Sequence, residues 1–310
     1  MVANATCVID TQLTMKVNDT TNAFFFVAHN GQVVPNFKAY FPGLDMLGKH
    51  YTVSNVVGSK VKRHYTICNV MQPKVYSTLV NHLKQGKTTV NEIIETSSTT
   101  SGENSSGKGE LTDLLQTVDT NRMMFVIKNY NQPFGLSQKF FTSPGSWYEV
   151  KGPMGKSLNV QSTGTHFAFA AGTGVLPFMD LIAQLAFYNL GMKHLLGSKT
   201  FEDGFKLKFY VSFQSRKDAI GLELLEALQD FCKKHLKDNF ELNLRISNEG
   251  KQRRWDSSFI EEQLKGFNSI SVHKVWVCGP PVMSETFDKT FDAIKTADPA
   301  RFGTGVLEVL

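Results

Sequence analysis

Three side chains with useful chemistry stand close together in a β-branched and aromatic segment, Val61–Asn69. Arg63 carries a planar fork that can pair with two oxygens of one phosphate. Tyr65 would share its strand face and could cover a flat ring, and Thr66 could donate a hydrogen bond to a ring nitrogen. Taken alone, the segment is better explained as an ordinary edge strand with one surface arginine.

Two glycine turns follow apolar segments in the second half of the chain. Ala170–Pro177 reads AAGTGVLP, and Cys278–Met283 reads CGPPVM. Glycines let a backbone approach a ligand, and the start of a helix offers free N–H groups to a phosphate. A tight strand-to-helix turn is the alternative for the first, and a buried small thiol is the alternative for Cys278. A third turn, Lys151–Lys156, collects Pro and Gly between the two halves.

The elements that must position these residues differ between the two halves of the chain. The first half has short β-branched and aromatic segments separated by Gly, Pro and Asn, which is typical of an antiparallel barrel or sandwich. Two short helices interrupt the strands. The predicted strands are 23–29, 50–57, 61–69, 122–128 and 146–151, and the predicted helices are 73–84 and 136–141.

The second half alternates between strands and helices. Its strands are continuously apolar, which predicts a parallel, doubly wound sheet. Ligands of such sheets bind at the carboxyl ends of the strands, where both glycine turns would lie. The predicted strands are 167–171, 206–213, 241–246, 272–277 and 305–310, and the predicted helices are 175–190, 221–236, 258–264 and 282–296.

A boundary between two domains is predicted near residue 160, where Gly, Ser and Thr collect. Residues 1–160 would form the barrel domain and residues 161–310 the α/β domain. In Thr96–Gly109, 11 of 14 residues are Ser, Thr or Gly, which favours a mobile surface insertion over residues 85–111. A neutral insertion is favoured over a regulatory or phosphorylated one.

Composition excludes several classes of protein. Of the 310 residues 41% are hydrophobic and 20% are charged, which indicates a folded, globular chain. The net charge of +5 suits an acidic protein partner but is too small and too scattered to indicate nucleic-acid binding. The four cysteines, Cys7, Cys68, Cys232 and Cys278, have no CxxC spacing, so we expect reduced thiols and no metal site.

No segment predicts a membrane span. The longest apolar stretch, 175–190, is interrupted by Asp180 and Gln184, and a span needs about 20 mostly apolar residues. We therefore expect an intracellular protein, in the cytoplasm or on the cytosolic side of a membrane, and a mitochondrial location stays open.

In their order and spacing these motifs resemble the ferredoxin–NADP reductase superfamily. Within it they are most similar to NADH–cytochrome b5 reductases and the flavin domain of nitrate reductases. The resemblance covers nearly the whole chain, from about Asn18 onward. It implies an N-terminal antiparallel β-barrel that binds FAD and a C-terminal doubly wound α/β domain that binds NADH or NADPH.

The resemblance also implies roles for residues of the first half. Arg63 would bind the FAD pyrophosphate, Tyr65 would flank the isoalloxazine ring, and the Thr66 hydroxyl would lie near flavin N5. The family segment Ile-Lys-x-Tyr is matched by residues 127–130, and a phosphate-binding turn is matched by residues 134–138. The further residues implied to contact the cofactors are Lys128, Tyr130, Gly135, Leu136 and Ser137.

In the second half, the glycine turn would receive the flavin edge and the nicotinamide nucleotide, and Cys278 would lie beside the nicotinamide. Thr66 and Cys278 are the residues predicted to act in catalysis. The residues implied to bind the nucleotide are Gly172, Thr173, Gly174, Cys278, Gly279, Pro280 and Met283. The chain departs from the family pattern at Ile67, Phe134 and Ala171, where the family has Pro, Gly and Gly.

The preference between the two nucleotides stays open. No acid stands at Ser247, where the NADH-using relatives have Asp. The residues near strand ends that could receive a 2′-phosphate are Ser215, Arg216, Arg245, Arg253 and Arg254, although each also suits a solvated surface.

The implied function is an FAD-dependent oxidoreductase. A hydride would pass from NAD(P)H to the flavin, and single electrons would then pass to a haem protein such as an acidic cytochrome b5, either separate or a fused domain. Two alternatives stay open: a non-catalytic subunit of a larger assembly, and the cytosolic flavin domain of a ferric-reductase-like membrane oxidoreductase.

Overall fold

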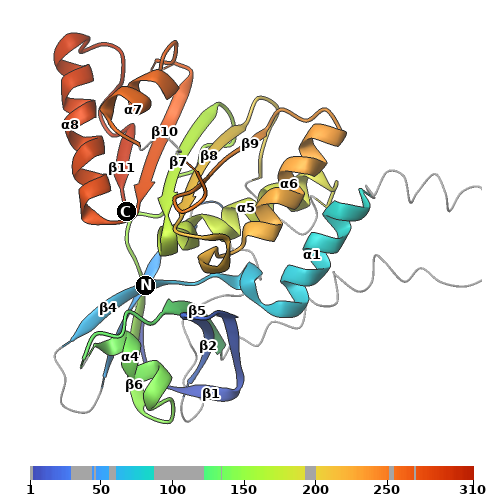
Figure 1. Ribbon diagram of the computed structural model, residues 1–310, viewed down its shortest axis with the longest axis vertical. Coiled ribbons are helices and arrows are strands. Elements are labelled where there is room, and N and C mark those ends of the chain that lie inside the picture. Colours follow the sequence, from blue (N-terminus) through green and yellow to red (C-terminus); the bar gives the residue numbers. More distant parts are fainter. Residues whose placement is uncertain are drawn as a thin grey trace, which may run out of the picture. The chain divides into compact units, whose positions relative to one another are not determined.

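The computed structural model describes residues 3–28, 44, 47–55, 61–86, 122–133, 135–192, 200–250, 255–268 and 270–310. The predicted insertion 85–111 lies outside these residues except for Gln85 and Gly86, and so do Phe134, Arg253 and Arg254. The chain divides into two compact units (Figure 1). One comprises Met1–Asn159 and Leu176–Thr200, and the other comprises Val160–Val175 and Phe201–Leu310. The domain boundary at residue 160 stays a prediction.

The first unit is built on a six-stranded antiparallel sheet in the order β4-β3-β6-β1-β2-β5. An antiparallel bridge between Ile67, just after β4, and Phe125 of β5 joins the two edge strands, so the sheet closes into the predicted barrel. Closure removes the exposed edges of the sheet. The strands are β1 (Ala3–Asn18), β2 (Thr21–Ala28), β3 (His50–Asn55), β4 (Lys62–Thr66), β5 (Arg122–Lys128) and β6 (Trp147–Met154).

The longest strand, β1, was not among the predicted elements. It pairs with both β2 and β6, and its register with β2 shifts between Asp10 and Met15. At this irregularity the Asp10 carboxylate accepts the N–H of Gln12 at 3.0 Å, and the Thr14 hydroxyl donates to the Asp10 carbonyl at 3.1 Å. An irregular strand with many polar residues gives no continuous alternation, so hydrophobic periodicity misses it.

Aromatic rings fill the barrel. Phe140, on the short helix α4 (Leu136–Thr142), is fully buried. Its ring centroid lies 5.5 Å from Phe26, 4.9 Å from Tyr148 and 5.7 Å from Tyr65. Because side chains of three strands meet this ring, Phe140 is a main anchor of α4 in the barrel interior, together with the buried Leu136.

Three helical segments complete the first unit. A 3₁₀ turn, η1 (Asn69–Met71), follows β4 and leads into α1 (Pro73–Gln85). Pro73 begins α1, and Gly86 ends it in the left-handed conformation that glycine tolerates. Helix α5 (Leu176–Asn189) packs against both η1 and α1, and nearly all of its side chains are buried. Its continuous apolar character matches this burial. None of the helices in the described part of the chain is long and apolar enough to cross a bilayer.

The second unit has the predicted parallel sheet, in the order β11-β10-β7-β8-β9. The chain runs outward from β7 to β9 and then returns to β10 and β11 on the other side of β7, which is the doubly wound pattern. The strands are β7 (Thr165–Ala171), β8 (Lys206–Phe213), β9 (Phe240–Ile246), β10 (Val272–Cys278) and β11 (Leu307–Val309).

Helices connect these strands. Helix α6 packs against β9, whereas α7 and α8 pack on each other over β10, and Figure 1 shows α6 and the α7–α8 pair on opposite sides of the sheet. This separation follows from right-handed crossovers that run in two directions from β7. The helical elements are η2 (Gly172–Val175), η4 (Arg216–Asp218), α6 (Leu222–Lys234), α7 (Ser257–Gln263) and α8 (Pro281–Ala297).

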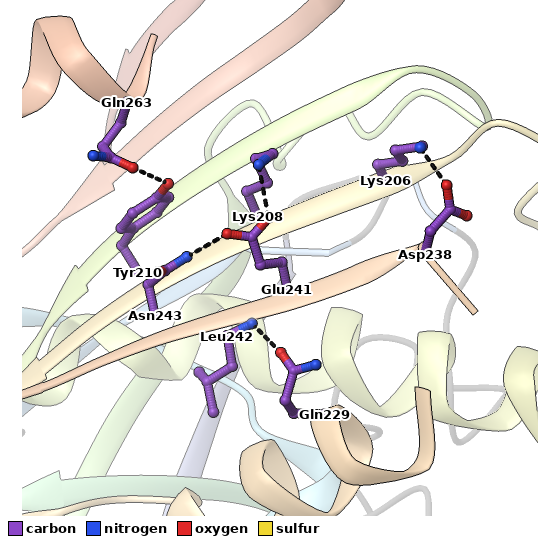
Figure 2. A network of polar contacts seen from close by, with 9 residues as sticks. All are labelled: Lys206, Lys208, Tyr210, Gln229, Asp238, Glu241, Leu242, Asn243 and Gln263. Atoms are coloured by element: carbon purple, nitrogen blue, oxygen red, sulfur yellow. Dashed lines mark hydrogen bonds and ion pairs between the residues drawn. The ribbon is translucent and has the colours of Figure 1, made fainter. Parts of the chain in front are cut away.

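Polar contacts tie β8 to β9 and to neighbouring helices (Figure 2). Lys206 pairs with Asp238, and Lys208 pairs with Glu241 at 2.7 Å. The Tyr210 hydroxyl donates to Gln263 of α7 at 2.8 Å. These three side chains of β8 alternate with buried apolar ones, so one face of the strand is polar at its start and aromatic toward its end.

The buried ring of Phe140 gives a test of the barrel core. Replacing it with alanine leaves a cavity between three strands and α4, and we expect a loss of about 3–5 kcal/mol in the free energy of unfolding. Urea denaturation measures this loss. Ile270→Ala is the control, because Ile270 is 86% exposed and its truncation should change the free energy by less than about 0.5 kcal/mol. A loss below about 1 kcal/mol for Phe140→Ala would contradict the packing described.

Candidate functional site

Arg63 and Tyr65 lie on one face of β4. The register of β4 with β3 places Arg63 opposite Val53 and Tyr65 opposite Tyr51, and both partners are buried. Residues directly opposite each other in an antiparallel pair share a face, so Arg63 and Tyr65 are on the barrel side. The guanidinium of Arg63 is nevertheless exposed, and one nitrogen donates to the Lys62 carbonyl at 3.0 Å. Most of its donors remain available to an anion.

Tyr65 belongs partly to the barrel core. Its ring centroid lies 6.0 Å from that of Phe125 as well as near Phe140, and the residue is half-buried. Burial raises the pKa of the Tyr65 phenol, while the nearby Arg63 lowers it and Tyr130 raises it further. The phenol is therefore neutral at pH 7, and it can act by covering a ring or by hydrogen bonding.

Lys128 and Tyr130 come next to Tyr65 because of the barrel closure. The bridge between Ile67 and Phe125 is antiparallel, so residues before Ile67 lie beside residues after Phe125. The Lys128 ammonium is 5.9 Å from the centre of the Tyr130 ring, and this ring is 57% exposed. The structure thus brings together four of the predicted residues, from β4 and from the end of β5.

Thr66 lies on the other face of β4, directly opposite His50. The His50 and His64 rings stack there with centroids 4.5 Å apart. Burial lowers the pKa of His50, and the positive form of His64 lowers it further. Sequence reasoning missed this imidazole pair, because neither His50 nor His64 belongs to a recognisable catalytic pattern.

The predicted phosphate turn precedes α4. Gly135 is the residue before the helix, and its carbonyl accepts the N–H of Lys139 at 3.2 Å. A Cβ at Gly135 would meet the Gln132 carbonyl oxygen at 3.1 Å, so the turn is tight. Leu136 is buried in the barrel core, and Ser137 is half-buried. No side chain caps the helix start.

The two glycine turns of the second unit pack against each other. Ala170 of β7 pairs with Cys278 of β10, so the turns that follow lie side by side at the carboxyl ends of these strands. A Cβ at Gly174 would overlap the carbonyl group of Cys278, and a Cβ at Gly279 would meet the sulfur of Met283 at 2.8 Å. Only glycine allows this approach of the two backbones.

Gly172 differs from Gly174. It has a φ of +57°, and a Cβ there would meet nothing within 4 Å. The backbone of Gly172 thus faces open space on its Cβ side, while Gly174 is packed against Cys278. This combination leaves room for a ligand at the strand ends, where doubly wound folds bind nucleotides.

Cys278 ends β10 between the two turns. Burial raises the pKa of its thiol to about 11, so the sulfur is protonated at neutral pH and is a weak nucleophile. Pro280 and Pro281 begin α8, and the N–H of Met283 donates to the Pro280 carbonyl at 2.9 Å. A neutral, partly exposed thiol on a rigid turn can shape a pocket by contact. Within the described ranges, no three His, Cys, Asp or Glu side chains gather as metal ligands.

The polar residues near the ends of β8 and β9 already have partners. Arg216 forms ion pairs with Glu226 at 3.0 Å and with Glu249 at 3.3 Å. The Ser215 hydroxyl donates to Asp218 at 2.7 Å, and Arg245 donates to the Ser212 hydroxyl at 3.0 Å. An added phosphate would therefore compete with carboxylates of the chain for Arg216 and Ser215. The buried Nε of Arg245, in contrast, has no hydrogen-bond partner among the described residues.

One buried carboxylate in the first unit was not predicted to have a role. Asp180 of α5 accepts the backbone N–H groups of Asn69 and Val70, at 3.2 and 2.9 Å. Burial raises the pKa of Asp180 to about 7, although the two hydrogen bonds lower it. The sequence did show a single acid, Asp180, inside the apolar stretch 175–190, but we interpreted it only as evidence against a membrane span.

The packing of the two turns predicts a large effect of one methyl group. Gly174→Ala should lower the free energy of unfolding by about 1–3 kcal/mol, because the added Cβ must push the Cys278 carbonyl away. Gly303→Ala in the same unit is the matched control, since a Cβ there meets nothing within 4 Å. Thermal unfolding compares the two variants. Equal stabilities would show that the turns do not approach as described.

Comparisons with known proteins agree with this architecture. No protein-family model and no curated protein matches the sequence. Among solved structures, the CS-b5R domains of human Ncb5or in the NAD⁺ form match with a TM-score of 0.59 and 17% identity, over 100% of this chain and 70% of that one. The FAD/NAD-binding domain of nitric oxide dioxygenase from Vibrio cholerae O1 biovar El Tor matches with a TM-score of 0.52 and 13% identity, over 99% and 98%.

A flavohemoglobin from Malassezia yamatoensis with bound FAD and heme matches with a TM-score of 0.54 and 12% identity, over 99% of this chain and 59% of that one. In two other matched proteins the chain spans only 28% of their length. At these identities the likeness concerns the fold. The chain has the fold of the ferredoxin–NADP reductase superfamily, as its motifs predicted.

Proposed function

We propose that the chain is an FAD-dependent oxidoreductase that takes a hydride from a nicotinamide nucleotide and passes single electrons to a haem protein. The observation that carries the proposal is the packing of Gly174 on Cys278, which leaves the bare backbone of Gly172 open at the strand ends. Support also comes from the matched structures, which include a flavohemoglobin with bound FAD and heme, an FAD/NAD-binding domain and an NAD⁺ form. The likeness of fold alone would not support this function, because one fold can host many activities.

The donor set of the first unit fits FAD. Arg63 offers an exposed guanidinium for the pyrophosphate, and Tyr65 with Tyr130 offers aromatic surface for the ring system. Lys128 adds a positive charge beside Tyr130. FAD, when bound, supplies the chemistry itself, since it accepts a hydride and releases electrons one at a time.

The residues of the chain then bind and orient. The Thr66 hydroxyl would donate to a ring nitrogen of the flavin, and the backbone N–H groups of Leu136 and Ser137 would contact its phosphates. The Gly135 N–H already donates to the Gln132 carbonyl at 3.0 Å, so Gly135 would contribute the shape of the turn. Neither the Tyr65 phenol nor the Cys278 thiol is ionised at neutral pH, so neither is placed as a base. Their contribution is orientation of the reacting rings, which alone can supply a large part of a rate enhancement.

In the second unit the nucleotide would bind along the two glycine turns. Gly172, Thr173 and Gly174 would bring the backbone against the nucleotide, as at other strand-to-helix turns that bind phosphates. Cys278, Gly279, Pro280 and Met283 would form the adjoining wall, with the neutral thiol beside the nicotinamide. Each of these side chains or backbone groups acts by contact, and none needs to transfer a proton.

The proposed acceptor is an acidic, one-electron haem protein. The net charge of +5 favours encounter with an acidic partner. The acceptor is a separate protein or a further domain, since the chain spans only part of several matched proteins.

The nucleotide that suits the second unit better is NADH. Arg216 is paired with two glutamates, and Ser215 donates to Asp218. A 2′-phosphate at this position would have to displace Glu226 and Glu249 from Arg216, and these carboxylates would repel it. These contacts of Arg216 and Ser215 therefore favour NADH over NADPH as the proposed nucleotide.

Freeing Arg216 should move the preference. We expect Glu226→Gln with Glu249→Gln to lower the KM for NADPH about tenfold and to leave the KM for NADH within about twofold. The control is the double variant Glu261→Gln, Asp292→Asn, which removes two charges from exposed positions on α7 and α8. Steady-state kinetics with NADH and with NADPH measure the two KM values. If the double variant at 226 and 249 behaves like the control, the carboxylates do not set the preference.

The proposed function is tested by anaerobic titration of the FAD-loaded protein with NADH and, in parallel, with NADPH. Bleaching of the flavin absorbance at stoichiometric addition is the expected result. A protein that binds FAD but is bleached by neither nucleotide would instead favour a subunit that keeps the fold without the activity. A protein that cannot be loaded with FAD would overturn the proposal.

Removal of the Arg63 guanidinium tests the proposed FAD site directly. We expect Arg63→Ala to weaken FAD binding about 10–100-fold, because a charge-assisted pair with the pyrophosphate is lost. Lys62→Ala is the matched control, as it removes an exposed positive charge one residue away on the opposite face of β4. Fluorescence titration with FAD measures both. Equal weakening by the two variants would indicate a general charge effect and remove Arg63 from the site.

A further inference from the structure

The carboxylate of Asp180 holds the backbone where the chain leaves β4. One of its oxygens accepts the N–H of Val70 at 2.9 Å and the other accepts the N–H of Asn69 at 3.2 Å. Asp180 is only 7% exposed, and Asn69 and Val70 are buried as well. These two amides begin η1, so α5 satisfies the donors at the start of this turn from 110 residues away.

No cation compensates the buried charge. The titratable groups on the elements packed against Asp180 are Lys74, Tyr76, His82 and Lys84 on α1, Tyr188 on α5, and Cys68 just before η1. Of these only the Cys68 thiol interacts electrostatically with the carboxylate, which raises the pKa of Cys68. In the described part of the chain the two backbone bonds are therefore what stabilises the ionised form.

The held segment lies directly after the predicted flavin strand. Only Ile67 and Cys68 separate Thr66 from Asn69, and both are buried, with Ile67 bridged to Phe125. Three residues span at most about 10 Å, so a displacement of η1 is transmitted to Thr66 with little slack. Buried amides that lose their acceptor must find another partner or become solvated, and either outcome moves the segment.

We propose that Asp180 is a positioning residue for the flavin half of the site: by binding the amides of Asn69 and Val70 it sets the exit of β4 and thereby the place of the Thr66 hydroxyl. The proposal rests on the proposed FAD-dependent function. Asp180 touches neither cofactor nor substrate in it, and it acts through the backbone.

A pH dependence follows from this arrangement. The pKa of Asp180 is raised by burial from 3.8 to about 7, so the folded protein holds this proton more tightly than the unfolded chain does. The resulting stability is fully present below about pH 4 and is lost as the pH rises through about 7. An opening of η1 that exposes the carboxylate is linked to pH in the same way, so protection of these two amides should also decrease as the pH rises through about 7.

The test is Asp180→Asn, which keeps the shape but leaves one acceptor oxygen and turns an NH₂ toward the second amide. We expect hydrogen-exchange protection of Asn69 and Val70 to fall about 10–100-fold. In the FAD-loaded protein we expect the rate of flavin reduction to fall about tenfold with an unchanged KM for NADH, and the step in this rate near pH 7 to disappear. The matched control is Asp256→Asn, because the Asp256 carboxylate caps α7 by accepting the N–H of Phe259 at 2.8 Å.

The outcomes separate the two hypotheses. Loss of amide protection together with slower flavin reduction, in Asp180→Asn but not in Asp256→Asn, supports the positioning role. Loss of protection with unchanged flavin reduction overturns it, and so does unchanged protection. If Asp180→Asn does not fold, wild-type protection of the Asn69 and Val70 amides decides, and exchange as fast as that of exposed amides overturns the proposal. A wild type that does not bind FAD, or whose bound FAD keeps its absorbance after NADH is added, overturns the proposed function and this role together, whatever the variant does.

Discussion

Closure of the barrel between Ile67 and Phe125 is the constraint on which the first unit depends. It places the residues before Ile67 beside the residues after Phe125, which brings Arg63 and Tyr65 next to Lys128 and Tyr130. It also determines where the chain leaves β4, and therefore where η1 begins. A single antiparallel bridge thus organises groups that lie more than 60 residues apart in the sequence.

The second unit depends on a comparable close approach, made by backbone alone. Ala170 and Cys278 are paired in parallel strands, and the turns that follow can lie together only because Gly174 has no side chain. The same packing makes Gly172 available, since its backbone faces open space. Gly174 therefore allows the two turns to pack together, and Gly172 of the same turn leaves its backbone accessible to a ligand.

Burial favours the neutral form of three side chains in and beside the candidate site. The pKa values of the Tyr65 phenol and the Cys278 thiol are raised, and that of the His50 imidazole is lowered. Groups of this kind position a ligand without exchanging protons with it, which suits a reaction whose chemistry belongs to a bound cofactor. Asp180 is the exception among the buried groups, because its raised pKa of about 7 keeps it close to half ionised at neutral pH.

The sequence by itself determined the fold class and the local motifs. Both depend on near neighbours: alternation and helical periodicity report the elements, and glycines between a strand and a helix report a turn. It did not indicate β1, whose polar residues and irregular register give no clean period. Nor did it indicate the His50–His64 stack, the partners of Arg216, or the bonds from Asp180 to Asn69 and Val70. Only the tertiary structure decided these contacts, because the partners are separated in the sequence. The type of a residue does not reveal which distant group it will contact in the fold.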